Sequence, residues 1–269
     1  MNKTYDVNNF AIDHVLRGIM TSASDGSLMW SINQISEPSL SVTTESTEAV
    51  DALGARIIEF DRAKKAEFSA QNSLFDLSLY AAQQGSGKEV ATETKKVTVP
   101  AFETIVVPDG ETKSAKLAHK PNTAPTEIYY MKGDDTFGKV VKCGDAAAEG
   151  VFAYNEAAQE ITFHTDAASG DQYFVQYEYE AKQAVAVTGD AINFPKAGRF
   201  VMEVLGSDIC DPSTLIHAYV IFPNAKLDAN VDVSFTTDGK HPFKIKANPD
   251  YCDREKVLFK IIVPSEETE

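Results

Sequence analysis

The residues of this chain that could do chemistry are few and widely separated. Its five histidines are His14, His119, His164, His217 and His241, and the closest two are 24 positions apart. A zinc protease needs His-Glu-x-x-His, a serine hydrolase needs Gly-x-Ser-x-Gly, and a dinucleotide enzyme needs Gly-x-Gly-x-x-Gly after a strand. None of these patterns occurs. We therefore predict that the protein is not an enzyme and that it binds no cofactor.

One short segment, Gly85-Ser86-Gly87-Lys88, has the composition of a phosphate-binding loop. The full pattern needs a glycine where Ala82 stands and a Ser or Thr where Glu89 stands. A phosphate loop also precedes its helix, whereas this segment follows the predicted one. The segment therefore predicts a helix end and not a nucleotide site.

Carboxylates and aromatic residues leave two interpretations open. The positions of glycosidase carboxylates are set by the fold, so sequence alone does not exclude them. A sugar-cleaving site usually carries several tryptophans, and this chain has only Trp30. The aromatic residues of TEIYYMK and QYFVQYEYE form either a carbohydrate-binding face or, as is commoner for alternating aromatics, core and cross-strand pairs.

The charge balance disfavours a protein that grips nucleic acid. The net charge is −15, and the longest basic clusters are Lys64-Lys65 and Lys95-Lys96. Binding to phosphates needs a basic stripe. The acidic excess indicates either simple solubility or a surface past which nucleic acid slides without sticking.

Cysteine usage and hydropathy bound the environment. Cys143, Cys210 and Cys252 are odd in number and far apart, which favours reduced thiols over disulfides or a metal site. No run of eighteen apolar residues occurs, so no membrane-spanning helix is predicted. The N-terminal MNKTYDVNNF lacks the apolar stretch of a signal peptide, and we expect the protein to be made in a cytoplasm.

Strands are predicted through the first part of the chain. Ser27–Ile35 alternates Leu28, Trp30 and Ile32 with smaller or polar residues, which is the period of a half-buried strand. Glu37-Pro38 is expected to end it. A polar hairpin should follow, with strands at 40–49 and 55–60 around a turn at 51–54.

A single helix is predicted over Lys64–Gln84, ended by Gly85. On a 3.6-residue wheel the apolar side chains form a wide arc, so the helix should pack firmly against a sheet. The residues expected at the centre of that contact are Phe68, Leu74, Phe75 and Leu79.

Between residues 95 and 187 short strands alternate with Pro, Gly and Asn, which predicts a small antiparallel β-sandwich. Because it lies in mid-chain, we interpret it as an insertion into a parent domain formed by residues 1–94 and 188–269. The strands expected in it are 97–99, 104–107, 127–131, 139–142, 151–154, 160–164 and 172–179.

After the insertion the predicted strands are longer, at 199–205, 215–222, 231–236, 243–247 and 257–263. A three-residue loop at Asp238-Gly239-Lys240 would match two apolar faces in a hairpin. That register places Phe235 opposite Phe243 and Val233 opposite Ile245.

Three segments resemble tail tube proteins of bacteriophages: KKAEFSAQNSLFDLSLYAAQQGSGKEV, AGRFVMEVLGSD and IFPNAKLDANVDVSFTTDGKHPFKIKA. The resemblance covers residues 10–95 and 190–263. The order of the three segments along the chain carries more weight than any single residue. The middle segment resembles the small immunoglobulin-like β domains that phage structural proteins often carry as insertions.

The resemblance implies a mainly β fold: a tail-tube-type β-sandwich or barrel with one flanking α-helix, plus the small inserted sandwich. It also implies that six subunits close a ring through their sheets and that the rings stack into a hollow tube. A long hairpin would contact the next ring. In this sequence that hairpin would be residues 43–61, with Thr44, Glu45, Glu48, Asp51, Leu53, Gly54 and Arg56 at the contact.

The same resemblance implies the partners and location. The chain would bind copies of itself and other tail proteins: a tape measure protein, a terminator and, where one exists, a sheath. DNA would pass through the lumen during genome ejection without specific binding, and no membrane would be involved. The insertion would project outward and so favour a non-contractile tail. The protein would be assembled in the bacterial cytoplasm and reside in the virion.

Two other functions remain open on the sequence. A head decoration or head–tail joining protein would share β-sandwiches and acidic charge. A carbohydrate-binding adhesion module would use the aromatic residues of the middle segment.

Overall fold

The computed structural model describes residues 9–165, 167–209, 211–249 and 255–264. The predicted features of the N-terminal eight residues, and those of Cys210 and Cys252, lie outside the described residues. The chain forms two compact units. One consists of residues 1–88 and 187–269, here called the body, and the other is the insert, residues 89–186.

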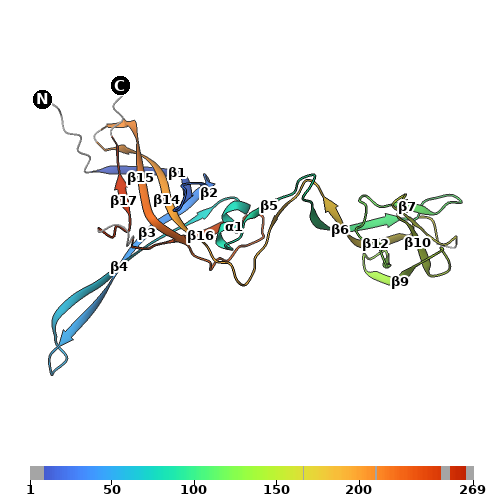
Figure 1. Cartoon of the computed structure of the whole chain (residues 1–269), viewed down its shortest axis with the longest axis horizontal. Coiled ribbons are helices and arrows are strands. Elements are labelled where there is room, and N and C mark those ends of the chain that lie inside the picture. The colour runs from blue at the N-terminus through green and yellow to red at the C-terminus, as the bar shows by residue number, and fades with distance from the viewer. Residues whose placement is uncertain (1–8, 166, 210, 250–254, 265–269) are drawn as a thin grey trace. The chain divides into compact units, whose positions relative to one another are not determined.

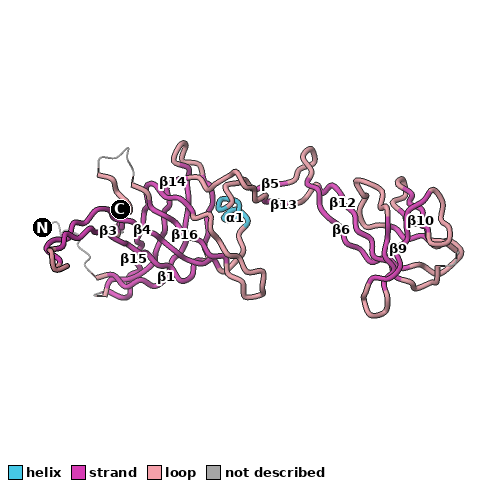
Figure 2. The backbone as a smooth tube through the Cα atoms, turned by 90° about the horizontal axis from the view of Figure 1, so that it is seen from below, coloured by secondary structure: helices cyan, strands magenta, loops and turns pink. Residues whose placement is uncertain are grey.

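The body is one strongly curled sheet, and its strands come from both ends of the chain (Figures 1 and 2). The strand order is β2-β1-β14-β15-β16-β4-β3, with β17 also paired to β15. These elements are β1 Phe10–Ser22, β2 Leu28–Ile32, β3 Ile35–Val50, β4 Arg56–Asn72, β14 Ala197–Asp208, β15 Asp211–Leu227, β16 His241–Ala247 and β17 Lys260–Ile262.

The core of the body explains why the sheet needs both halves of the chain. Trp30 and Phe68 from the first half lie against Phe200 from the second, with ring centroids 5.6 and 5.8 Å apart. All three side chains are buried. Aromatic residues of this size supply much of the apolar surface that stabilises a fold.

The predicted helix over Lys64–Gln84 is wrong in its first half, which continues strand β4. Ala66, Phe68, Ala70 and Asn72 are buried, and the residues between them are not, which is the period of a strand. Phe68 pairs with Ile245 of β16 on one side and Leu40 of β3 on the other. The Ala, Lys, Glu and Gln residues here favour a helix, but pairing with two neighbouring strands overrides that weak propensity.

The helix that does form, α1, spans Leu77–Gln83. Asp76 caps it, because its carboxylate accepts a hydrogen bond from the Leu79 backbone N–H at 2.7 Å. Just beyond its end, Gly85 has a positive φ of 72°. A Cβ there would lie 2.4 Å from the Phe194 backbone, so only glycine fits.

The predicted C-terminal hairpin is also wrong. Phe243 lies opposite Ala70, and Ile245 lies opposite Phe68 and Leu227. Residues 228–240 form no strand; they are a loop that carries an exposed Phe235 and a half-buried Val233. Strand β16 fills the gap between β15 and β4, where both of its edges are paired and Phe243 and Ile245 enter the core.

Two further boundaries differ from prediction. Strand β3 continues through Glu37-Pro38 as a bulge, with Glu37 at a φ of 52°, because the irregularity is absorbed between Ser36 and Ser39. The predicted strand at 257–263 is limited to β17.

The insert is a seven-stranded sheet with a core of its own. The order is β6-β12-β8-β9-β10-β11-β7. The core cluster includes the fully buried residues Ile128, Phe152, Ile161 and Val175, which come from four different strands. The elements are β6 Val97–Val106, β7 Ser114–Lys116, β8 Glu127–Met131, β9 Phe137–Gly144, β10 Val151–Asn155, β11 Glu160–Thr162 and β12 Gln172–Ala181.

The insert departs from the predicted antiparallel sandwich in two places. Strands β9 and β10 run parallel, with Phe152 opposite Cys143. The predicted strands 97–99 and 104–107 form the one strand β6, which contains Pro100. Proline is tolerated because β6 lies at the end of the sheet and pairs with β12. At the boundary of the two units, β5 (Lys88–Val90) pairs with β13 (Val185–Val187).

Candidate assembly surfaces

The most prominent feature of the body is a long hairpin formed by β3 and β4, which leaves the sheet and projects alone (Figure 1). The pairing runs from Thr43 opposite Lys65 to Val50 opposite Arg56. From Arg56 to Lys65, β4 pairs with β3 alone, because its pairing with β16 ends at Ala66. Both edges of the ribbon are therefore open along residues 43–65, within the described chain.

The hairpin turn is built by Asp51. Its carboxylate accepts hydrogen bonds from the backbone N–H groups of Leu53 at 2.9 Å and Ala55 at 2.8 Å. Gly54 supplies a positive φ of 84°. Leu53 at the tip is almost fully exposed. The turn therefore holds an apolar side chain at the tip of the hairpin in a defined position.

The two faces of the hairpin have different chemistry. A bulge at Arg62 shifts the alternation of β4 by one residue. One face carries an ion-pair group in which Arg56 contacts Glu48 at 3.1 Å and Glu59 at 2.9 Å. The other face carries the apolar side chains of Ala49, Ile58, Phe60 and Ala63, together with Thr47 and Glu45, which pair with Phe60 and Ala63.

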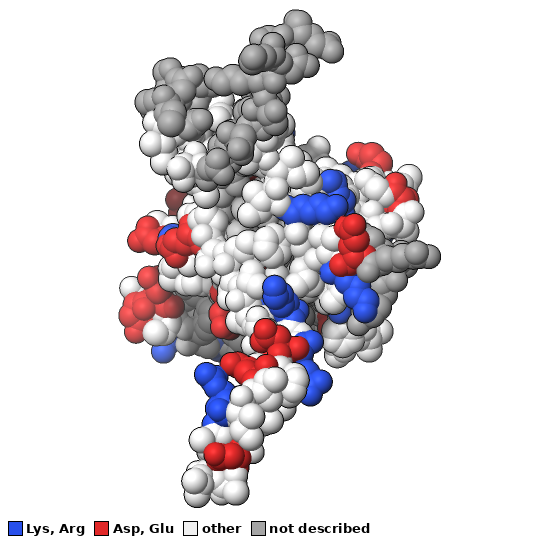
Figure 3. Space-filling model, turned by 90° about the vertical axis from the view of Figure 1, so that its left-hand side faces the viewer, with Lys and Arg blue, Asp and Glu red and all other residues white. Residues whose placement is uncertain are grey.

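Surface charge on the hairpin is mixed. Figure 3 shows Asp and Glu side chains interspersed with Lys and Arg along the projecting ribbon. Lys65 forms an ion pair with Glu45 across the strands. Exposed ion pairs of this kind contribute little to stability. Their charges instead oppose uncontrolled pairing of the open ribbon edges with other strands.

The predicted contact residues all lie on this hairpin. Three of them lie on β3 and three lie in the turn, and the seventh is the first residue of β4. They are Thr44, Glu45, Glu48, Asp51, Leu53, Gly54 and Arg56, and all are exposed. Ile57, Ile58 and Phe60 were not among the predicted contact residues, although they are large, exposed apolar side chains of the ribbon. The exposed apolar residues of the predicted strand at 55–60 are the signal that would have found them.

The residues predicted as the helix-packing core are divided by the structure. Phe68 and Leu79 are buried, the first on β4 and the second on α1. Leu74 is 63% exposed and Phe75 is 42% exposed. The latter two belong to the surface between β4 and α1, so their assignment to the core was wrong.

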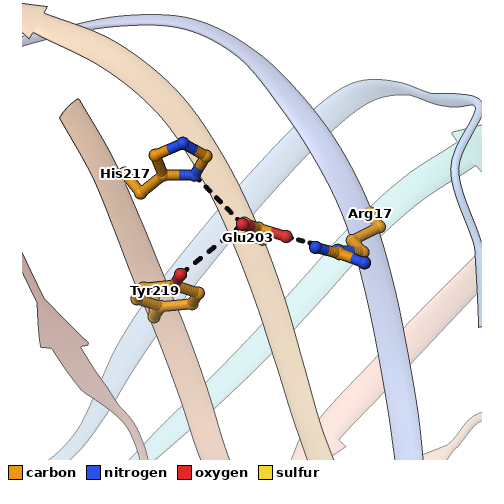
Figure 4. A network of polar contacts seen from close by, with 4 residues as sticks. All are labelled: Arg17, Glu203, His217 and Tyr219. Atoms are coloured by element: carbon orange, nitrogen blue, oxygen red, sulfur yellow. Dashed lines mark hydrogen bonds and ion pairs between the residues drawn. The ribbon is translucent and has the colours of Figure 1, made fainter. Parts of the chain in front are cut away.

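A polar network centred on the buried Glu203 joins three strands of the body (Figure 4). Glu203 of β14 accepts a hydrogen bond from Arg17 of β1, and it contacts His217 at 3.0 Å and Tyr219 at 3.5 Å, both on β15. The hydrogen bond from Arg17 holds the pKa of the Glu203 carboxyl below its usual value. An ionised, fully partnered carboxylate is a poor proton acceptor, so this network stabilises the sheet and does not resemble a catalytic base.

The insert presents an aromatic surface on the side of its sheet away from the core. Phe102 of β6, Phe174 of β12, Tyr129 of β8 and Phe137 of β9 lie in a row of ring contacts, with centroids 5.0 to 6.5 Å apart. Phe102 is 67% exposed. We call these four residues the aromatic row. The sequence left open whether the aromatic segments form a binding face or core pairs, and β12 does both: Phe174 belongs to the aromatic row, whereas Tyr173 and Tyr177 are buried.

The model of the YomU/Tube protein family, a family of phage tube-like proteins, matches residues 10–255. The chain belongs to this family. The match runs through both parts of the body and through the insert, so the family covers the hairpin and the aromatic row alike. The resemblance to phage tube proteins is thereby confirmed at the level of the family, and so is the mainly β fold with one helix.

Membership of a tube family agrees with a structural role in the tail of a virion. No curated protein matches the chain significantly. No helix among the described residues is long and apolar enough to span a membrane. In the same part of the chain, no group of three or more His, Cys, Asp or Glu residues is placed to hold a metal ion. Cys143 is a free thiol.

Proposed function

We propose that this YomU/Tube family member is a structural, non-catalytic subunit that assembles into stacked, hexameric rings. The rings form the tail tube through which phage DNA is ejected. The observation that carries the proposal is the β3–β4 hairpin. It is a paired ribbon with both faces exposed and with large apolar side chains, and these would be buried only by contact with another molecule.

The sheet of the body supports ring closure. Strand β2 pairs on one side with β1, and β3 pairs on one side with β4, so the sheet has a free edge at each end within the described residues. Free edges favour uncontrolled pairing, and closing a ring of subunits removes them. We propose that neighbouring subunits in a ring are joined through these edges.

The acidic balance supports passage of DNA. A net charge of −15 repels phosphates, so a lumen lined by this chain would let the genome slide without binding. We further propose that the insert is an inserted domain on the outside of the tube, since a second unit of 98 residues in the lumen would obstruct it.

Electron microscopy of the purified protein tests the proposal. We expect six-fold rings and hollow rods at high protein concentration. Particles that remain monomeric at high concentration, together with absence of the protein from the shaft of the mature virion, would overturn it. Trimers bound to capsids would instead indicate a head decoration protein, and a single ring at the head–tail junction would indicate a joining protein.

The aromatic row favours a second candidate function, carbohydrate binding by the insert. Exposed aromatic rings suit the apolar faces of sugar rings, and polar side chains at Gln172, Gln176 and Glu127 occupy the same face of the sheet by strand alternation. Sedimentation of the protein with insoluble bacterial peptidoglycan tests this function. We expect co-sedimentation that Phe174→Ala abolishes, and equal co-sedimentation of both proteins would contradict it.

A further inference from the structure

A second apolar surface lies at the opposite end of β4 from the hairpin. It consists of Leu74 and Phe75, which connect β4 to α1, of Leu77, the first residue of α1, and of Phe235 from the loop before β16; we call it the α1-end patch. Phe235 is 85% exposed and contacts Phe75, with ring centroids 5.8 Å apart. Four large apolar side chains are therefore exposed at this end of the body, and contiguous apolar surface is what a contact with another molecule would cover.

One residue of the α1-end patch, Phe75, packs on a buried histidine. The ring of Phe75 stacks on His241 at 5.1 Å, and His241 is fully buried. His241 accepts a hydrogen bond from the Asp76 backbone N–H at 3.3 Å and donates one to the Gln83 side chain at 2.8 Å. Gln83 in turn donates to the Pro242 carbonyl at 3.0 Å. Phe75 is therefore held in place before any partner arrives, which lowers the entropic cost of binding at this residue.

The hairpin and the patch cannot meet within one chain. The hairpin includes the first part of β4, and the patch begins just after the end of β4. The thirteen residues from Phe60 to Asn72 are extended strand, which separates the two surfaces by about 40 Å. Figures 1 and 2 show the hairpin and α1 at opposite ends of the body in both views. Each surface must therefore be covered by another molecule or stay exposed.

We propose that Ala49, Ile58, Phe60 and Ala63, on one face of the hairpin, dock on the α1-end patch of the next copy along the tube. This inference rests on the proposed tube function and assigns the surface that receives the hairpin. Two different surfaces at opposite ends of one subunit make a head-to-tail contact, which continues without closing and builds a linear stack. A second copy is the occupant because every subunit carries one hairpin and one patch. The two lie at opposite ends of the body, so the hairpin of one copy can reach the patch of the next.

Charge variants at the two surfaces test the docking. Phe60→Glu places a carboxylate on the hairpin face, and Phe235→Glu places one on the patch, where high exposure makes misfolding of the subunit unexpected. For each variant we expect rings without stacks and a loss of at least about tenfold in the ring–ring association constant. Ile192→Glu is the matched control, since Ile192 is 81% exposed in the body but belongs to neither surface.

Mixing the two variants separates this proposal from a general loss of assembly. Phe60→Glu rings keep an intact patch and Phe235→Glu rings keep an intact hairpin, so an equal mixture should give pairs of rings and no longer stacks. If wild-type protein forms tubes and Phe235→Glu also forms tubes of the same length, the docking site is wrong while the tube function stands. If wild-type protein forms no tubes, the proposed function itself fails.

A cysteine pair decides the question even if a charge variant misfolds. Phe60→Cys combined with Phe235→Cys should give a ladder of disulfide-linked subunits on mild oxidation of wild-type-like tubes. Phe60→Cys combined with Ile192→Cys, and the parent protein with its native cysteines, should give none. Equal ladders in all three samples would overturn the proposal.

Discussion

Arg17 donates a hydrogen bond to Glu203, and this contact joins a strand near the start of the chain to a strand that follows the insert. Strands β1 and β14 pair along most of their length, with Arg17 directly opposite Glu203. Any assembly built on this body depends on that seam, because it unites the two segments separated by 98 residues of insert.

Replacing Glu203 should weaken the body in a pH-dependent manner. Because its pKa is lowered in the folded state, the carboxylate contributes stability above its unfolded pKa, near 4.5, and the contribution is lost as the pH falls through the lower folded value. We expect Glu203→Gln to lower the free energy of unfolding by about 1–2 kcal/mol at pH 7. The difference from wild type should shrink towards zero below pH 4, measured by denaturant titration. Glu45→Gln, at an exposed ion pair, is the control and should change little at any pH.

His241 should make α1 sensitive to mild acid. Burial lowers the pKa of its imidazole, so the folded protein favours the neutral form. Stability is then complete above the unfolded pKa of 6.5 and declines as the pH falls below it towards the folded value. We expect the Tm to fall between pH 7 and 5, and this fall to be smaller in His241→Gln. His14→Gln, at an exposed histidine, is the control and should show the same fall in Tm as wild type. An equal fall in all three proteins would contradict the assignment.

Phe68 and Leu74 offer a direct test of the strand assignment. Phe68→Ala removes a fully buried ring from the core and should cost about 3–5 kcal/mol in the free energy of unfolding. Leu74→Ala alters a side chain that is mostly exposed and should cost less than about 1 kcal/mol. Chemical denaturation measures both. Similar losses at the two positions would instead favour a helix packed through both residues.

Shortening the hairpin should separate folding from stacking. Deleting residues 50–55 and joining the strands removes the turn but none of the buried core. We expect a folded subunit with a nearly unchanged Tm that forms no tubes in electron micrographs. Tubes of normal length from this variant would rule out a stacking role for the hairpin tip.

Removing the insert should leave the body able to assemble. The backbone N–H of Ala91 donates to the Ala184 carbonyl at 2.8 Å, so the two crossing segments are close together. Replacing residues 92–183 with a short Gly-Ser linker should therefore close the chain without strain. We expect a soluble protein that still forms tubes; an insoluble product would show that the insert belongs to the folding core of the body.

The sequence by itself determined the features that depend on local patterns. Alternation marked most strands of the insert, with Glu127–Met131 predicted at its observed bounds, and Asp51 with Gly54 marked the hairpin turn. Mid-chain changes in strand spacing indicated an excursion between two parts, and the order of three segments pointed to the tube family that the comparison shows. These signals are local because turns, bulges and side-chain alternation involve neighbouring residues.

Only the tertiary structure decided what depends on distant neighbours. Residues 64–72 have helix-forming composition, yet they are a strand because β3 and β16 supply hydrogen-bonding partners on both sides. Phe243 faces the core opposite Ala70, and Phe235 remains exposed, because β16 pairs with β4 and not with the loop before it. The strand that pairs with a given segment is usually distant in sequence, so the local sequence of the segment does not determine which strand it pairs with.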